Sequence, residues 1–174
     1  MNNTYWHLKA ALRSVLQRKG YHFVKSQWVK QCDEVTQVVC LDKSPDGDEY
    51  YLEVGVFIHL LGSPPSMLMR YAPYRARLCG RLNNEYDELL FVYLNRDVIT
   101  DAERERRFRD LLESDTAPLL DCLTSIAGLR ECYWHPFNRN VAVFRTASPL
   151  LFGTDIAPRE NSTEAEQIKG IKPL

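Results

Sequence analysis

The side chains that could act as general bases are the four histidines of the chain: His7, His22, His59 and His135. Nucleophilic catalysis needs such a base beside a nucleophile and beside a group that orients the base. The sequence contains no Gly-x-Ser-x-Gly turn, the motif that exposes a serine nucleophile at the end of a strand. We therefore interpret each histidine as a half-buried structural residue and expect a non-enzymatic protein. A hydrolase whose pocket the sequence does not reveal is one alternative.

Two short patterns contain part of a metal site. Cys122 precedes Cys132-x-x-His135, but the second ligand pair of a tetrahedral zinc site is missing. Asp42-x-Ser44-x-Asp46-Gly47 with Glu53 matches part of a calcium loop, yet it lies between two expected strands, whereas calcium loops of this kind join helices. Gly62-Ser63-Pro64-Pro65 lacks the glycines and the lysine of a phosphate loop. The sequence therefore predicts no metal and no cofactor.

Four arginines fall within residues 61–82, which contain no acidic residue. On a strand, Arg75, Arg77 and Arg81 would share one face, and such a row could bind phosphate or carboxylate groups. This pattern leaves two interpretations open. The row forms a nucleic-acid or nucleotide site, or it pairs with acids of the neighbouring strand, for example Glu53. We favour the ion pairs, because surfaces of mixed sign are the norm.

An acidic block precedes the arginines. Residues 33–60 contain seven acids and one lysine. An acidic patch steers the encounter with a basic partner, so it indicates a protein-binding face. We predict that this face consists of Asp42, Asp46, Asp48, Glu49 and Glu53.

The aromatic segment 133–137 is a second candidate for partner binding. Its Tyr-Trp-His-Pro-Phe sequence is expected to form a loop that either covers the core or presents an anchor to a partner. Tryptophan and tyrosine dominate the energetics of protein interfaces. Trp134 is therefore added to the predicted partner-binding residues.

The elements that position these residues follow from the hydrophobic period. Apolar residues three and four apart predict a helix over residues 5–18, ended by Gly20. Alternation then predicts strands at residues 21–28, 35–41 and 49–61, with a turn at Ser44-Pro45-Asp46-Gly47. Further strands are expected at residues 74–82 and 89–94, and residues 141–144 are expected to form either a short strand or a terminal segment.

The helical period returns near Thr100, and the acids that follow it suit the start of a helix. Asp115-Thr116-Ala117-Pro118 is expected to interrupt that helix and to start another, which ends at Gly128. The predicted fold is α+β: an N-terminal helix, an antiparallel meander of four to five strands, and two C-terminal helices packed on one face of the sheet.

Length and composition place the chain among ordinary globular proteins. Its 174 residues are 45% hydrophobic and 26% charged, with a net charge of −1, so its surface as a whole does not seek phosphate. We expect one domain over residues 1–157 and a polar, flexible tail over residues 158–174. The odd number of cysteines, the absence of a signal-peptide pattern and the absence of an apolar run of about 20 residues predict a reduced, cytoplasmic protein without membrane contact.

Three segments resemble a bacterial family known as domain of unknown function 4304. They are the opening helix running into Lys19-Gly20-Tyr21-His22-Phe23, the meander ending in Leu52-Glu53-Val54-Gly55-Val56, and the stretch Arg75-Ala76-Arg77-Leu78-Cys79-Gly80-Arg81-Leu82. The family has no established activity, and small bacterial domains of this kind often neutralise toxins. The resemblance and the acidic block lead us to expect an immunity protein that binds a basic toxin domain, with nucleic acid as the alternative partner.

Overall fold

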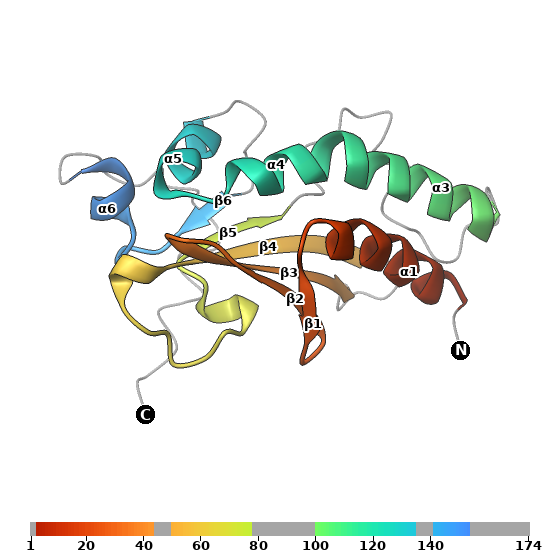
Figure 1. Cartoon of the computed structure of the whole chain (residues 1–174), viewed down its shortest axis with the longest axis horizontal. Coiled ribbons are helices and arrows are strands. Elements are labelled where there is room, and N and C mark those ends of the chain that lie inside the picture. Colours follow the sequence, from red (N-terminus) through yellow and green to blue (C-terminus); the bar gives the residue numbers. More distant parts are fainter. Residues whose placement is uncertain (1–2, 44–49, 78–99, 135–140, 154–174) are drawn as a thin grey trace.

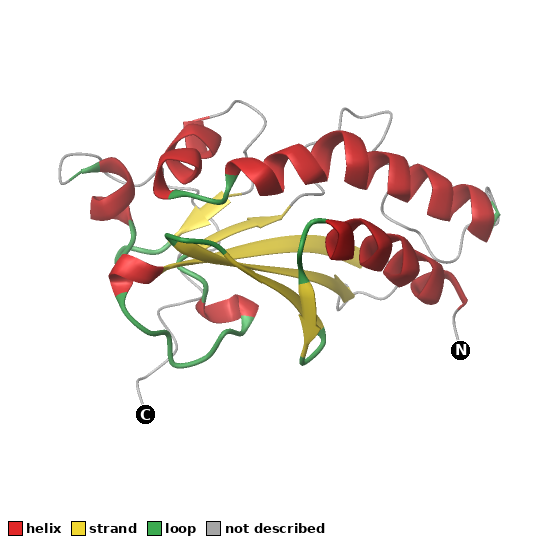
Figure 2. Ribbon diagram, in the orientation of Figure 1, coloured by secondary structure: helices red, strands yellow, loops and turns green. Residues whose placement is uncertain are grey.

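The computed structural model describes residues 3–43, 50–77, 100–134 and 141–153 of the 174-residue chain. These residues form a six-stranded antiparallel sheet in the order β1-β2-β3-β4-β5-β6, with the α-helices on one face (Figures 1 and 2). Two short 3-10 helices, His59–Leu61 and Met69–Tyr71, lie in the connection between β4 and β5. The predicted α+β arrangement is confirmed, with six strands among the described residues where four to five were expected. No helix among these residues combines the length and the apolar character needed to cross a membrane.

Helix α1 (Asn3–Arg18) forms where the sequence predicts it. It buries one stripe against the sheet, consisting of Leu8, Leu12, Val15 and Leu16. Gly20 follows in the left-handed conformation with φ of 83°, and the amide of Tyr21 donates to the carbonyl of Leu16 at 3.0 Å. This C-terminal motif turns the chain directly into the sheet.

The segment that the alternation predicts as one strand over residues 21–28 belongs to a hairpin that spans residues 22–31. β1 (His22–Val24) and β2 (Gln27–Gln31) pair antiparallel through a two-residue turn. The turn residues Lys25 and Ser26 both have positive φ, 45° and 68°. That is the pattern of a type I′ turn, which normally selects Asn and Gly. Because neither residue is present, the sequence gives no turn signal here.

The centre of the sheet is a long hairpin. β3 (Val35–Lys43) pairs with β4 (Tyr50–Ile58) over nine residues, from Val35 opposite Ile58 to Lys43 opposite Tyr50. Short strands β5 (Tyr74–Arg77) and β6 (Val141–Val143) complete the sheet. The predicted strand at residues 89–94 and the second half of the one at 74–82 lie outside the described residues, as does the turn at 44–47.

The helical layer differs from the prediction in one respect. Helix α3 (Asp101–Leu111) begins at Thr100, whose hydroxyl accepts from the amide of Glu103 at 3.2 Å. It does not break at Asp115–Pro118. It continues through a single π-helical turn (Leu112–Thr116) into α4 (Ala117–Cys122). Pro118 comes just after the π-helical turn, and this local change of helical register accommodates a residue that has no N–H.

Gly128 does not end a helix either. It lies inside α5 (Ile126–Trp134), whose first amide donates to Glu34 Oε2 at 3.0 Å. Tyr133 and Trp134 are therefore helical, which corrects the predicted loop for these two residues, while residues 135–137 lie outside the described part. Helix α6 (Ser148–Phe152) packs beside α5, with the rings of Tyr133 and Phe152 4.3 Å apart.

The two faces of the sheet are covered differently. Under the helices lies the main core, to which α1, α3, α4 and α5 contribute together with the inward residues of every strand from β2 to β6. On the opposite face, the β4–β5 connection (residues 59–73) covers only a small second cluster: Val38, Cys40, Phe57, Met69 and Ala72. The tight packing of this connection requires Gly55, because a Cβ there would lie 2.6 Å from Met69 Sδ and 2.7 Å from Ala72 Cβ.

Candidate partner-binding site

Beyond the second cluster, the sheet face opposite the helices carries polar side chains on β3, β4 and β5. Alternation sends Asp42, Tyr51, Glu53, Arg75 and Arg77 to this face. We call these five residues the open face. Strand register places them in direct neighbourhood: Asp42 opposite Tyr51, Glu53 opposite Arg77, and Arg75 opposite Gly55. The open face therefore brings together two of the acidic residues predicted for partner binding, Asp42 and Glu53, and two arginines of the predicted row, Arg75 and Arg77.

Arg77 and Glu53 form the central contact of the open face. Nε and Nη2 of Arg77 donate to Glu53 Oε1 at 3.0 and 2.8 Å. The guanidinium also lies 4.3 Å from the ring centroid of Tyr51, a distance suited to a cation–π contact. The predicted pairing of the arginine row with Glu53 is confirmed for Arg77. This ion pair orders Tyr51, Glu53 and Arg77 relative to one another.

Arg75 is held differently. Its guanidinium carbon lies 5.3 Å from the ring centroid of Phe144. Its Nε is buried and has no hydrogen-bond partner among the described residues. Arg81, the third member of the predicted row, lies outside the described residues, so the structure places only Arg75 and Arg77 on one face.

Cys40 borders the open face, and its chemistry is that of a protonated thiol. It is 6% exposed, and its Sγ donates to Asp42 Oδ2 at 3.3 Å. Burial, followed by the carboxylates of Asp42 and Glu53, raises the pKa of this thiol well above its ordinary value. Because the thiolate is the nucleophilic form, Cys40 is a poor nucleophile near neutral pH.

The same three groups are the best metal-ligand set among the described residues. The ligand atoms of Cys40, Asp42 and Glu53 all lie within 4.8 Å of one another. However, Asp42 accepts from the thiol and Glu53 accepts from Arg77, so Arg77 already neutralises one of the two carboxylates. The arrangement is explained by ion pairing within the sheet.

Of the predicted acidic residues, the structure places Asp42 and Glu53. Asp42 is exposed, and Glu53 is 20% exposed at its side chain. Asp46, Asp48 and Glu49 lie outside the described residues, in the connection between the paired residues Lys43 and Tyr50. Trp134 is the last residue of α5, and its side chain also lies outside the described part.

Two histidines have structural partners. Nδ1 of His59 lies 2.9 Å from the carbonyl oxygen of Asp33, and its Nε2 lies 2.9 Å from Thr36 Oγ1. Since a carbonyl only accepts, Nδ1 is the nitrogen that donates to Asp33, and in the neutral ring Nε2 accepts from the hydroxyl. His7 Nδ1 lies 2.9 Å from Glu105, which also accepts from Arg109 at 2.8 Å. His22 is exposed on β1, and His135 is outside the described residues.

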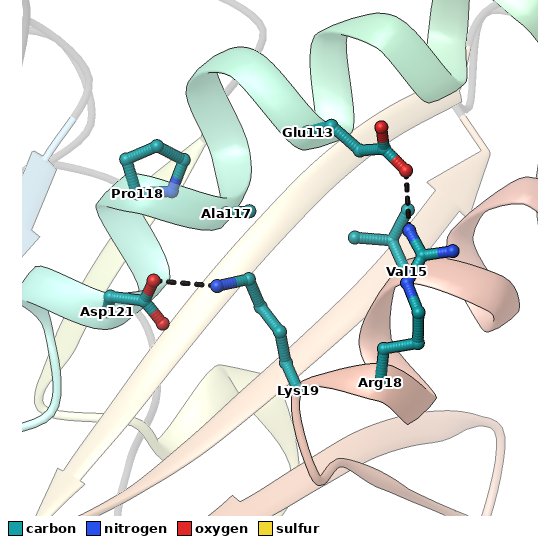
Figure 3. Close-up of a pocket in the computed structure, with 7 residues that line it drawn as sticks. All are labelled: Val15, Arg18, Lys19, Glu113, Ala117, Pro118 and Asp121. Atoms are coloured by element: carbon teal, nitrogen blue, oxygen red, sulfur yellow. Dashed lines mark hydrogen bonds and ion pairs between the residues drawn. The ribbon is translucent and has the colours of Figure 1, made fainter.

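A groove of about 270 Å³ lies between the C-terminal end of α1 on one side and the π-helical turn and α4 on the other (Figure 3). Its charged side chains form two ion pairs, Arg18 with Glu113 at 2.5 Å and Lys19 with Asp121 at 2.6 Å. Val15, Ala117 and Pro118 complete the lining. Each charged side chain that lines the groove is paired with one of opposite charge, so the groove is an interface between helices held by salt bridges. None of its lining residues is left as a free general acid or base.

Sequence reasoning missed Tyr51 as a site residue. Tyr51 follows Tyr50 on β4, so the two side chains point to opposite faces of the sheet. The ring of Tyr50 stacks on Tyr5 on the core side, with ring centroids 5.1 Å apart. The alternation of β4 was enough to send Tyr51 to the face of Glu53, but its contact with Arg77 depends on the register of β4 and β5.

Comparison with known proteins adds no relative: no family model, no curated protein and no solved structure matches this chain.

Proposed function

We propose that this chain is a protein-binding module of the immunity type, which neutralises a toxin by direct contact through the open face. The observation that carries the proposal is the ordered group of Tyr51, Glu53 and Arg77 beside the exposed Asp42. Tyrosine and arginine are the residues that most often anchor protein interfaces. Tyr51 projects from β4 and Arg77 from β5. Both strands lie inside the sheet and pair with a strand on each side, so the scaffold beneath the two side chains is rigid.

Preorganisation supports binding on this face. A side chain that is disordered in the free protein loses about 0.5–1.5 kcal/mol of rotamer entropy when an interface immobilises it. Tyr51, Glu53 and Arg77 already hold one another through the ion pair and the ring contact. Much of that entropy is therefore lost on folding, and less remains to be lost when a partner binds.

The sign of the face favours a basic partner. Within the open face, Arg77 neutralises Glu53, and Asp42 remains exposed. The sequence adds three acids in the six residues between the paired ends of β3 and β4. A local excess of negative charge raises the rate at which a basic protein surface docks, and salt weakens this effect. Toxins that act on nucleic acids are commonly basic, which fits the immunity proposal.

The first experiment tests the immunity role itself. Products of the genes adjacent to the one encoding this chain are expressed singly in a bacterial host, with and without this chain. We expect one of them to stop growth alone, and the chain to restore growth and to form a complex measurable by calorimetry. If no neighbouring product inhibits growth, or if the chain fails to rescue growth, the immunity role is wrong.

The second experiment tests the face. Tyr51→Ala should weaken the complex about 30-fold or more, the effect of losing an anchor worth about 2 kcal/mol. Asp42→Lys should slow association about tenfold at low salt and less at high salt, because it reverses a steering charge. Glu131→Lys is the matched control, an exposed acid on α5 in the helical layer. Equal affinities for all three folded variants and the unaltered chain would remove the open face from the proposal.

A further inference from the structure

Two cysteines from consecutive helices meet in the helical layer. Cys122 is the last residue of α4, Cys132 lies in the last turn of α5, and their Sγ atoms are 2.8 Å apart. Both residues are thiols in this structure. This separation is shorter than an ordinary contact between two thiols and approaches the roughly 2.05 Å of a sulfur–sulfur bond. The geometry brings the two atoms close to the position in which they could bond.

Backbone packing holds the two thiols together. Gly128 in α5 lies so near the end of α4 that a Cβ on it would be 1.7 Å from the carbonyl oxygen of Cys122. The Cys122 thiol donates to the carbonyl oxygen of Gly128 at 3.5 Å. The hydrogen bond from the amide of Ile126 to Glu34 fixes the start of α5 over the sheet. The two sulfurs are therefore positioned by the fold and do not depend on the freedom of their side chains.

The two thiols differ in access. Cys132 is 6% exposed and belongs to the main core, whereas Cys122 is half-buried at the edge of that core. A small oxidant from solvent therefore reaches Cys122 first. Cys132 is then positioned to react from the protected side, as the resolving cysteine does in redox-sensing pairs.

We propose that Cys122 and Cys132 form a reversible disulfide, with a peroxide as the oxidant and a small thiol as the reductant. The Cys122 thiol gives up its proton, its sulfur attacks one peroxide oxygen and the O–O bond breaks; Cys122 becomes a sulfenic acid, and the departing hydroxide takes that proton and leaves as the first water. The Cys132 sulfur then attacks the sulfenyl sulfur, so that the S–S bond forms and the S–O bond breaks. The departing hydroxide takes the proton of Cys132 and leaves as the second water. Two thiols have then given two electrons to one peroxide.

The proposal is independent of the proposed function, and mass spectrometry of the full chain tests it. Fully reduced protein is treated with one equivalent of hydrogen peroxide, blocked with N-ethylmaleimide and digested with trypsin. Cleavage after Arg109, Arg130 and Arg139 separates the two cysteines into peptides 110–130 and 131–139. We expect these peptides to be joined, with the loss of two hydrogens, and to be released by dithiothreitol.

Substitutions distinguish this pair from general thiol oxidation. Cys132→Ala should prevent the link and leave a sulfenic acid on Cys122 that dimedone traps. Cys40→Ser is the matched control, because Cys40 is equally buried at 6% exposure and its thiol is hydrogen-bonded to Asp42 instead. It should leave the joined peptides unchanged. The proposal is overturned if peptides 110–130 and 131–139 stay separately alkylated, or if Cys122 pairs with another cysteine.

Discussion

Gly55 provides the most direct test of how the β4–β5 connection packs on the sheet face opposite the helices. Replacing it with alanine would place a Cβ 2.6 Å from Met69 Sδ and 2.7 Å from Ala72 Cβ. Real Cβ atoms do not approach other heavy atoms so closely, so the β4–β5 connection must move away from the sheet. Met69 can rotate its side chain, but the Cβ of Ala72 can move only with the backbone. The clash with Ala72 therefore sets the cost.

The size of the effect follows from two opposing contributions. Overpacking of a filled site costs about 1–3 kcal/mol. Replacing a strand glycine with alanine returns roughly 0.5–1 kcal/mol, because the unfolded chain loses conformational freedom. The expected net loss for Gly55→Ala is about 1–2 kcal/mol of unfolding free energy, which for a chain of this length corresponds to a melting temperature lower by about 3–6 °C.

Urea denaturation followed by tryptophan fluorescence measures this change, and a second substitution supplies the control. Ala72→Gly removes the atom with which the new Cβ collides, so Gly55→Ala should cost less in that background than in the unaltered chain. Residues in contact typically couple by about 0.5–3 kcal/mol. Strict additivity of the two changes, or a Gly55→Ala protein as stable as the parent, would refute the argument that the β4–β5 connection packs directly on Gly55.

Three further predictions concern the helical layer. Hydrogen bonds from Arg106 and Arg107 lower the pKa of Glu103 to about 2 from its ordinary 4.5; because the folded pKa is the lower one, its stabilisation is complete above about pH 4.5 and is lost as the pH falls toward 2. Glu103→Gln should therefore flatten the dependence of urea midpoints on pH in that window, and an unchanged slope would contradict the assignment. Gln37 is fully buried, donates to the carbonyl oxygen of Leu120 at 2.8 Å and accepts from the hydroxyl of Tyr21. Gln37→Leu should cost about 2–4 kcal/mol, since it leaves two buried groups without partners, and adding Tyr21→Phe should recover part of that loss; no recovery would mean that the Tyr21 hydroxyl does not depend on Gln37. Oxidation of Cys122 and Cys132 should raise the unfolding free energy by about 3 kcal/mol for a loop of this length, and denaturation with and without dithiothreitol measures the difference.

Hydrophobic period was sufficient to predict the elements that bury a clean stripe. Helix α1 and the long strands β3 and β4 lie where the sequence places them, because each has a continuous apolar face. The hydrophobic period did not predict features whose backbone geometry depends on tertiary contacts. The turn at Lys25 and Ser26 has positive φ without glycine or asparagine, and Pro118 is accommodated by a π-helical turn. Neither feature has a signal in local residue types.

The candidate site could be predicted in part for the same reason. Alternation sends Asp42, Glu53, Arg75 and Arg77 to one side of their strands, and an ion pair between Arg77 and Glu53 follows from opposite charges on neighbouring strands. The pairing of Cys122 with Cys132 could not be foreseen. It depends on α5 starting at Ile126 and enclosing Gly128, whereas the sequence suggests that a helix ends there.

The order of the strands has a consequence for how the chain folds as it is synthesised. Every strand pairs with the strand before it, so the hairpins β1–β2 and β3–β4 can form as soon as their residues leave the ribosome. Helix α1 emerges first, but the helix that covers it comes about 100 residues later, and His7, Ser14 and Arg18 reach their partners Glu105, Arg109 and Glu113 only then. The packing of α1 against α3 is therefore completed only after more than half of the chain has been synthesised, whereas its packing on the early hairpins can form before that.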